Sequence, residues 1–393
     1  MSEPRVQSDV DLFSPDVVAD PFPVLAELRE KSAAVYMSKY EFWLLSRYED
    51  VREATGDWEG FTSARGVALR QDFNDFLKGG VLANDPPEHD RLRAILSDKL
   101  APRALKDVRN EIQAYAAAVA AEHTAKGSFD GYKDIAAVYP INVISDLIGL
   151  PVEDREKFHP GADATFAGFG PITQYLQEHF QEMVTYQQWI PTMADRSKLT
   201  PGKWGDVMMD AVDEGRIGLD DAVASLNAYL TAGMDTTVNA LSATFALFAE
   251  RPEIWSAVRE DRGLLRQVLE EVLRLESPVT GFFRIATQDI QIDGTPIPTG
   301  GRVMLHWAAA NRDPRHYPDP DTFDLHRNPL DHLAFGYGAH GCPGRGIAIL
   351  EMTALFEAFI PLVEAFELSG PIVRGKNPVV RSLDAVPLTV KAN

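Results

Sequence analysis

One stretch constrains the fold of this chain more than any other, residues 219–252, which read LDDAVASLNAYLTAGMDTTVNALSATFALFAERP. It begins with acidic residues and ends at Pro252, the usual signals for the start and the stop of a helix. About 30 residues at 1.5 Å each give a helix of roughly 45 Å, long enough to cross a whole domain. Its apolar residues lie nearly all the way round, so we expect it to be buried at the centre of a large helical fold.

The rest of the chain adds helices and a few strands. Residues 105–127 are rich in alanine and end in a glycine, which is typical of a helix. Strand patterns are confined to residues 33–46, 290–305 and 378–390, and the first two read as hairpins. With no internal repeat and no flexible linker, the sequence predicts one domain over residues 1–393, mainly α with a small β region.

Composition excludes several classes of protein. The formal charge of −20 argues against a nucleic-acid binder, which needs a basic surface. The N-terminus lacks the basic start and apolar run of a signal peptide, and no segment approaches the roughly 18 apolar residues of a membrane span. A single cysteine forms no internal disulfide. We therefore expect a soluble, cytoplasmic protein that contacts neither nucleic acid nor membrane.

That one cysteine lies in the glycine-rich string FGYGAHGCPG, residues 335–344. Glycine lets the backbone approach something flat and bulky, and loop amides directed at the sulfur favour a thiolate. A structural zinc site needs four ligands and the chain has no second cysteine, whereas heme needs only one protein sulfur. A lone cysteine is otherwise an ordinary small buried residue. The string favours heme binding through Cys342.

The same string resembles the heme-ligand signature F-G-x-G-x-H-x-C-x-G of the cytochrome P450 monooxygenases, and the resemblance covers essentially the whole chain. It implies the P450 fold, a single heme domain with a long distal helix, and heme b as cofactor. It implies that Cys342 is the axial ligand of the iron. Phe335, Gly336, His340 and Gly344 are implied to contact the heme.

The middle of the long stretch, AGMDT at 232–236, carries a second motif. Glycine costs about 1 kcal/mol in a helix relative to alanine, and a buried acid is costly without a purpose. A local distortion of such a helix is a common way to admit a ligand. By resemblance this is the oxygen-binding groove of the P450 distal helix, where Asp235 and Thr236 form the catalytic pair that delivers protons for O–O cleavage.

Two further motifs match the family in order and spacing. Glu271 and Arg274 form an E-x-x-R, which by itself is an ordinary helical pair. By resemblance it is the family's buried scaffold network, which an arginine of a later segment usually completes; here that segment is residues 313–323, and Arg327 follows it closely. His89 and Arg93 are four apart and share one helix face.

By resemblance the cations that contact the heme propionates are His89, Arg93, Arg284 and His340. Cations facing carboxylates are the expected chemistry. The other histidines, including His159, have no such context and are left as structural.

A locally basic stretch, Arg91 to Arg109, interrupts this acidic chain. It is either a solvated helix face or a docking patch for an acidic partner. In P450s the electrons arrive from an acidic ferredoxin or flavodoxin on the cysteine side. We therefore expect a ferredoxin, reduced by an NAD(P)H-dependent reductase, to dock near Arg91–Arg109.

Local strings at 63–67, 165–171, 231–240 and 276–284 resemble the bacterial P450s that O-demethylate 4-methoxybenzoate and related aromatic acids. A flat apolar slot of this kind suits a benzene ring. On that resemblance the residues that line the substrate pocket are Phe166, Phe169, Ala232, Val279 and Phe282.

The expected clamp for a substrate carboxylate is not evident. Lys78 or Arg70 could supply the charge from the loop before residue 85, whereas Asn74, Asn227 or Thr231 suit a neutral phenol better.

The sequence thus predicts a monooxygenase that uses O₂ and two electrons to hydroxylate or O-demethylate a small methoxybenzoate- or methoxyphenol-like aromatic. Three alternatives stay open at this point. The substrate is a compact terpenoid or another small hydrophobe; the enzyme is driven by peroxide, against which the intact Asp235–Thr236 pair counts; or the protein is a non-catalytic heme-binding sensor.

Overall fold

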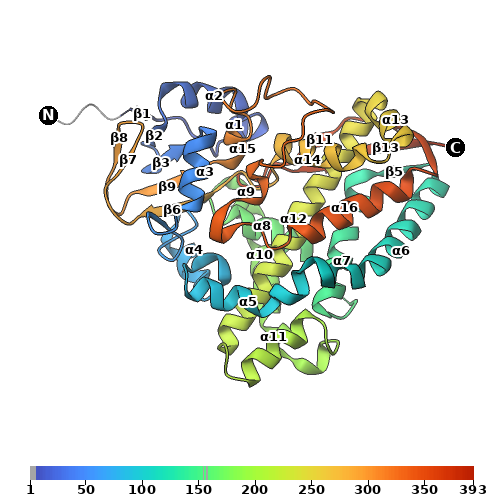
Figure 1. Ribbon diagram of the computed structural model, residues 1–393, viewed down its shortest axis with the longest axis horizontal. Helices are drawn as coiled ribbons and strands as arrows, with labels where there is room; N and C mark the ends of the chain where they lie inside the picture. Colours follow the sequence, from blue (N-terminus) through green and yellow to red (C-terminus); the bar gives the residue numbers. More distant parts are fainter. Residues whose placement is uncertain (1–5, 154, 156–157) are drawn as a thin grey trace.

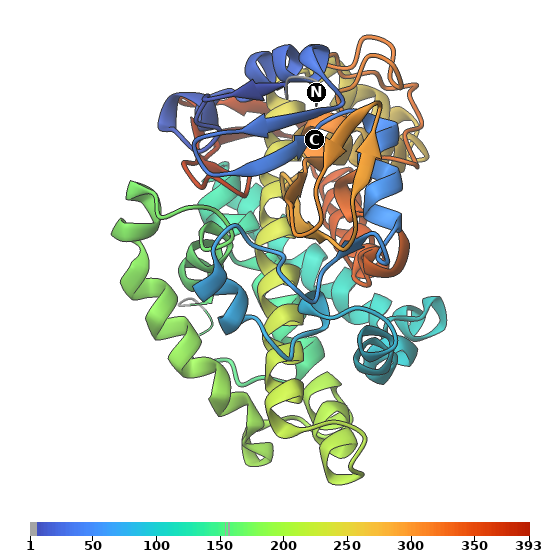
Figure 2. The same ribbon diagram turned by 90° about the vertical axis from the view of Figure 1, so that its left-hand side faces the viewer.

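A long buried helix forms the axis of the molecule, as the sequence predicts. In the computed structural model, which describes residues 6–153, 155 and 158–393, this helix is α12 (Leu219–Glu250). It runs through the centre of the fold, with the main sheet near its C-terminal end and α11 (Trp204–Asp213) near its N-terminal end (Figures 1 and 2). Asp220 and Asp221 occupy its first turn, where negative charge complements the helix dipole.

Shorter helices pack around α12. Further α-helices are α1 (Pro15–Ala19), α2 (Phe22–Lys31), α3 (Tyr48–Gly56), α4 (Gln71–Phe76), α5 (Glu88–Leu100), α6 (Pro102–Lys126), α7 (Tyr139–Ile148), α8 (Phe158–Ala167), α9 (Gln174–Glu178), α10 (Phe180–Trp189), α13 (Pro252–Glu260), α14 (Leu264–Glu276), α15 (Trp307–Ala310) and α16 (Arg345–Phe359). Single helical turns are η1 (Val81–Ala83), the π-helical η2 (Gly131–Ala136), η4 (Ile190–Ala194), η5 (Arg196–Lys198), η6 (Leu333–Phe335) and η7 (Gly338–His340). Within the described ranges, no helix has both the length and the hydropathy that crossing a membrane requires.

The strands form one six-stranded sheet and three small ones. The large sheet has the order β1 (Gln7–Ser8), β2 (Ala34–Met37), β3 (Phe42–Leu45), β9 (Arg302–Leu305), β6 (Phe282–Ala286) and β4 (Phe61–Thr62). The others are β10 (Val363–Leu368) with β13 (Pro387–Ala392) and β5 (Ser128–Asp130), β11 (Val373–Arg374) with β12 (Leu383–Ala385), and β7 (Ile290–Ile292) with β8 (Thr295–Ile297).

Both predicted hairpins are confirmed. Strands β2 and β3 pair antiparallel, and so do β7 and β8, whose turn has Asp293 at φ 45° and Gly294 at φ 79°. Left-handed φ at both turn positions matches the right-handed twist of the flanking strands. The third predicted strand region divides into β12 and β13, which pair with different partners.

The predicted Glu271–Arg274 network is also confirmed, and it fixes the segment that leads to the cysteine loop. Both side chains are fully buried, and Arg274 donates Nε to Glu271 Oε2 at 2.7 Å and Nη2 to Oε1 at 2.8 Å. Arg274 Nη1 also donates to the carbonyls of Asn311 and Pro320, and Arg327 Nε reaches Glu271 Oε1 at 3.1 Å. Helix α14 is thereby tied to residues 311–327.

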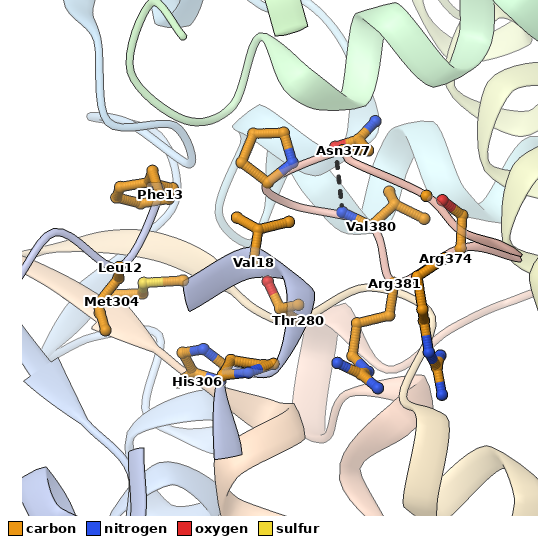
Figure 3. Close-up of a pocket in the computed structure, with 14 residues that line it drawn as sticks. Leu12, Phe13, Val18, Thr280, Met304, His306, Arg374, Asn377, Val380 and Arg381 are labelled. Atoms are coloured by element: carbon orange, nitrogen blue, oxygen red, sulfur yellow. Dashed lines mark hydrogen bonds between the residues drawn. The ribbon is translucent and has the colours of Figure 1, made fainter. Parts of the chain in front are cut away.

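A small hollow lies where the 374–382 turn meets the N-terminal segment around Leu12 and Phe13 (Figure 3). Its volume of about 30 Å³ suits a single water molecule. At its edge Asn377 Oδ1 accepts hydrogen bonds from the backbone N–H groups of Val379 and Val380, at 3.0 and 3.2 Å. These two hydrogen bonds hold the turn and orient the Asn377 amide.

Candidate active site around Cys342

A cavity of about 280 Å³ lies between α12 and the segment that carries Cys342. Predicted site residues that line it are His89, Arg93, Phe166, Phe169, Ala232, Thr236, Val279, Phe282, Phe335, His340, Cys342 and Gly344. The predicted site residues Asp235, Arg284 and Gly336 lie outside this lining. Residues more than 250 positions apart in the chain therefore meet around one space.

The cysteine loop turns the Cys342 side chain into this cavity. The backbone N–H of Cys342 donates to the Phe335 carbonyl at 2.8 Å, and Gly336 and Gly338 have left-handed φ values of 64° and 69°. A Cβ at Gly338 would come within 2.8 Å of Gly56 Cα, so this glycine is required by close packing. Burial raises the pKa of the Cys342 thiol, while amides and nearby arginines oppose the rise.

One wall of the cavity presents the basic side chains of His89, Arg93 and His340, and two of their nitrogen atoms have no partner among the described residues. The Nε2 atoms of His89 and His340 are buried and have no hydrogen-bond partner among the described residues, and the two ring centroids lie 4.4 Å apart. Arg93 lies beside them and donates Nη1 to the Ala339 carbonyl at 2.7 Å. Burial, helped by the charges of Arg284, His89 and Arg93, lowers the pKa of His340 to about 3. Such a cluster calls for an anion.

Arg284 lies behind this wall, in β6. It is buried, and its one hydrogen bond to a described residue is donated by Nη1 to the Phe283 carbonyl at 2.7 Å. Burial lowers the pKa of its guanidinium to about 10, and the charge of Asp85 only partly opposes this. A buried guanidinium without a carboxylate in contact adds to the need for an anion.

These donors fit the heme that the sequence analysis expects. A thiol faces the cavity from one segment, and orphaned imidazole groups with a guanidinium line another part of it. The two carboxylates of heme match that donor set, because a buried donor left without an acceptor costs about 1–3 kcal/mol.

The distal wall is α12, which runs without a break through residues 232–236. The helix is therefore continuous through this motif. Close packing explains the glycine at position 233, because a Cβ there would come within 2.9 Å of Ile144 in α7. The glycine lets α7 and α12 pack closely.

The two members of the predicted catalytic pair face different sides of α12. Thr236 lines the cavity, and its Oγ1 donates to the Ala232 carbonyl at 2.7 Å. Asp235 is 1% exposed and lies toward α8, where its Oδ1 is 3.2 Å from His159 Nε2. That contact lacks the alignment of a straight hydrogen bond, and Asp235 Oδ2 has no partner among the described residues.

Aromatic rings form the other end of the cavity. Phe169 follows α8 and lies 4.8 Å from Phe282 of β6 and 6.0 Å from Phe166, measured between ring centroids. Val279 and Ala232 border the same region. All five residues predicted to hold the substrate thus line the cavity.

A chain of neutral polar groups adjoins these rings. Asn227 Nδ2 donates to Gln187 Oε1 at 3.1 Å, and Thr231 Oγ1 donates to Asn227 Oδ1 at 3.0 Å. The Tyr186 and Thr231 hydroxyls lie 2.9 Å apart. Asn227 and Thr231 line the cavity, so the polar groups it offers near the rings are uncharged.

The two cations considered as carboxylate clamps do not line the cavity. Lys78 is 70% exposed and pairs with Asp75 at 2.6 Å, and Arg70 pairs with Asp72. Asn74 is taken up by backbone bonds of its own loop. Among the described residues, the basic side chains that line the cavity are Arg93, His89 and His340.

Only some of the cations in the basic stretch Arg91–Arg109 are free of polar contacts with the rest of the described chain. Arg93 faces the cavity, Arg91 pairs with Glu88, and Lys99 donates to the Gly202 carbonyl at 3.0 Å. The remaining cations of the stretch are exposed and form no ion pair with a described residue; they are Arg103, Lys106 and Arg109. They lie on the first turns of α6, which packs against α16 so closely that a Cβ at Gly346 would come within 2.7 Å of Leu105.

Several lining residues carry no signal that the sequence analysis used. Tyr229 has a buried hydroxyl without a partner among the described residues, and so has the Glu351 carboxyl at Oε2. Burial raises the pKa of Glu351 well above its usual range. As the one acid in the apolar run IAILEMTALF, Glu351 could have been singled out, because a lone buried carboxyl is costly.

Comparisons with known proteins agree with this geometry. A family model described as Cytochrome P450 matches residues 165–383. Cytochrome p450 CYP199A2 of Rhodopseudomonas palustris is 36% identical over 387 residues, covering 96% of this chain and 93% of the relative. Beta-dihydromenaquinone-9 omega-hydroxylase of Mycobacterium tuberculosis is 30% identical, covering 98% and 78%. The crystal structure of epothilone D-bound cytochrome P450epoK has a TM-score of 0.87 at 27% identity and covers 98% of this chain and 100% of that one.

Proposed function

The chain belongs to the cytochrome P450 family, and from this premise we propose that it hydroxylates or O-demethylates a small, uncharged aromatic substrate. As a family member it is a monooxygenase, its cofactor is heme, and it uses O₂ with electrons from a redox partner. Membership sets aside the non-catalytic sensor. It leaves the substrate open, because the relatives include a dihydromenaquinone hydroxylase and an epothilone epoxidase. We also propose that residues 1–393 act as one catalytic domain.

The heme contacts follow from the cavity. We assign the iron ligand to Cys342, the only cysteine of the chain, whose side chain faces the cavity. His89, Arg93 and His340 are assigned to the propionates, with Arg284 behind them. Phe335, Gly336 and Gly344 belong to the loop that presents the thiol. Bound there, heme supplies the reductive activation of O₂.

Thr236 and Asp235 are assigned to proton supply. Each turnover, RH + O₂ + 2e⁻ + 2H⁺ → ROH + H₂O, takes up two protons inside the cavity. Thr236 presents its hydroxyl to the cavity, and the Asp235 carboxyl lies on the next residue, on the side of α12 away from the cavity. A proton held by the acid can reach the cavity through the alcohol, which accepts one proton as it donates another.

The proposed class of substrate rests on the aromatic slot and on the uncharged polar groups at its edge. Phe166, Phe169 and Phe282 offer flat apolar surfaces that hold a benzene ring by stacking and edge contacts. Hydroxylation of an aryl methyl ether on its methyl carbon gives a hemiacetal, which releases formaldehyde and leaves the phenol. The slot therefore suits a methoxyarene as well as a simple arene.

The edge of the slot favours a phenol over a benzoate. A substrate carboxylate there would be buried without a counter-charge, which is costly, because the cavity cations lie in the cluster around His89 and His340. Asn227 and Thr231 can donate to and accept from a neutral hydroxyl. The resemblance to 4-methoxybenzoate enzymes thus supports the ring, while the polar edge supports a neutral substituent on it.

A binding titration tests this proposal. Ferric protein is titrated with 4-methoxyphenol, 4-methoxybenzoate and compact terpenes, and the shift of the Soret band reports entry of the ligand. We expect 4-methoxyphenol to bind at least about tenfold more tightly than the benzoate, since one hydrogen bond to a buried polar group is worth about 1–3 kcal/mol. Asn227→Leu should remove this preference, and the control Lys78→Ala should leave it unchanged.

Each other outcome has a defined meaning. Tight benzoate binding that Lys78→Ala abolishes would overturn the neutral-substrate proposal and assign the clamp to that lysine. A response to terpenes alone would establish the compact-hydrophobe alternative.

We also propose that an acidic ferredoxin docks at the free basic patch of Arg103, Lys106 and Arg109. Charge complementarity raises association rates, and the raised rate falls with salt. The triple variant Arg103→Glu, Lys106→Glu, Arg109→Glu should lower the rate of electron transfer from reduced ferredoxin about tenfold or more at low ionic strength. Arg91→Ala, which removes a paired cation, serves as the control. Stopped-flow reduction that is equally fast in the triple variant would place the docking site elsewhere.

A further inference from the structure

We propose that His159 and Asp163 form a buried proton relay that links the surface near Asp384 to Asp235 on the distal helix. The proposal rests on the assigned roles of Asp235 and Thr236. It adds two residues of α8 that act through Asp235, and it gives a direction from which protons enter. It also assigns His159 a role beyond the structural one that the sequence suggested.

The relay begins with the position of α8 against α12. His159 and Asp163 are four residues apart, so they lie on one face of α8, and each is 8% exposed. His159 Nε2 is 3.2 Å from Asp235 Oδ1, and the Tyr132 ring packs against the imidazole at 6.0 Å between centroids. The imidazole is thus in contact with the acid that stands behind Thr236.

Asp163 is held by neutral donors. Asn377 Nδ2 donates to its Oδ1 at 3.0 Å and to its backbone carbonyl at 2.8 Å, and the Tyr175 hydroxyl donates to its Oδ2. The amide of Asn377 is held in this orientation, because its oxygen accepts from the backbone N–H groups of Val379 and Val380; Figure 3 shows the second of these bonds. Asp163 therefore keeps one oxygen as an acceptor, and any proton it gains sits on Oδ2, shared with Tyr175.

The charges in this cluster favour stored protons. Three carboxyl groups, those of Asp235, Asp163 and Asp384, act on one imidazole. Burial alone would lower the pKa of His159, but contact with Asp235 and the charges of the other two acids raise it overall. Burial and the charge of Asp235 raise the pKa of Asp163, although Tyr175, His159 and Asn377 oppose the rise. Both groups thus hold protons more readily than they would in water.

The cluster reaches solvent at Asp384 of β12. Asp384 is exposed, and the positive charges that act on it come from His159, Lys376, His179 and Lys133. Its pKa is raised, mainly by partial burial, so it can also take up a proton from water. Tyr175 is partly exposed and stacks on His179 at 4.3 Å.

Proton transfer along this route balances. When Asp235 gives its proton to Thr236, His159 in its imidazolium form passes one to Asp235 and becomes neutral. The imidazole then regains a proton from water on the side of Asp384, and the charges of Asp163 and Asp384 favour its return to the imidazolium form. Repeated twice per turnover, this supplies the two protons that the reaction consumes, while both electrons come from the redox partner.

Isosteric variants test the relay. His159→Gln can still donate to Asp235 but holds no extra proton, and Asp163→Asn keeps its contacts but loses its acid. With electrons from ferredoxin, we expect each to lower product formation at least tenfold and to divert reducing equivalents to hydrogen peroxide. With hydrogen peroxide as oxidant the rates should stay within about twofold of wild type, because that oxidant brings both electrons and both protons. His123→Gln, a buried histidine on α6 bonded to the Val119 carbonyl, is the matched control.

A measurement independent of turnover reports the protonation itself. In ¹⁵N-histidine-labelled protein, held as its diamagnetic ferrous carbon monoxide complex, we expect the His159 ring to titrate above the ordinary histidine pKa and to move down in Asp235→Asn. Wild-type turnover should fall above that pKa, and His159→Gln should lack this step because it is slow throughout.

The outcomes separate the relay from the function on which it rests. Impaired Asp235→Asn with unimpaired His159→Gln and Asp163→Asn would overturn the relay and leave the acid–alcohol pair in place. Wild-type turnover in Asp235→Asn and Thr236→Ala would overturn the assigned proton pair as well. Equal loss with ferredoxin and with peroxide would indicate damage to the cavity and overturn the relay.

Discussion

Cys342→Ala is expected to abolish oxygen insertion, lowering product formation at least about a thousandfold, which equals about 4 kcal/mol in the activation barrier. The chain has no second cysteine that could take over, and the thiolate donates the electron density that favours O–O cleavage. Heme should still enter the variant, because His89, Arg93 and His340 line the same cavity. The loss should therefore be one of chemistry and not of folding.

Three measurements on Cys342→Ala separate these effects. Heme content should remain above half of the wild-type value, the circular dichroism spectrum should be unchanged, and the Soret band of the ferrous carbon monoxide complex should lose the red shift typical of thiolate ligation. Asn142→Ala, at a partly exposed position remote from this loop, is the control for expression and handling. A variant that kept the thiolate-type band would show that Cys342 is not the ligand.

Arg274→Ala is expected to destabilise the protein by about 3–5 kcal/mol, because it removes one partner of a buried ion pair and the two hydrogen bonds that it donates to Glu271. Glu271 would keep Arg327 at 3.1 Å, but the carbonyls of Asn311 and Pro320 would lose their donor. Such a loss is a large part of the stability of an ordinary domain. We expect the variant to lose heme and to unfold at much lower urea concentration.

The same helix supplies the control for this experiment. Arg266→Ala removes a half-exposed arginine whose partner, Glu270, also accepts from His332 at 2.9 Å, so its cost should stay within about 1 kcal/mol. Urea unfolding followed by circular dichroism compares the two variants. Equal midpoints would mean that the buried network contributes no more than the half-exposed Arg266 does.

Local patterns predicted the parts of the fold that depend on neighbours in sequence. The apolar surface of residues 219–250 and the glycine turn at 293–294 each specify their element almost alone, and both elements formed as expected. The cysteine loop is likewise contiguous, so its glycines and Cys342 could be read together. Gly233 was interpreted from its neighbours in sequence, whereas the side chain that requires a glycine there, Ile144, is distant in the sequence.

Packing decided what local patterns could not. Arg91 and Arg93 are two residues apart on α5, yet one pairs with Glu88 and the other enters the cavity. Nothing in their spacing says which face meets the core, and the same holds for Lys78, which lies outside the cavity. His159 gained its context only when α8 was placed against Asp235, 76 positions further along the chain.

The solitary thiol also makes this protein convenient for chemical attachment. Because Cys342 is assigned to the heme iron and no other cysteine exists in the chain, a surface residue changed to cysteine becomes the single free thiol of the heme-loaded protein without removal of any native one. Lys106→Cys, on the free basic patch, would place a dye or an electrode linker where the electron donor is proposed to dock. The distance and rate of electron entry could then be set by the length of the linker.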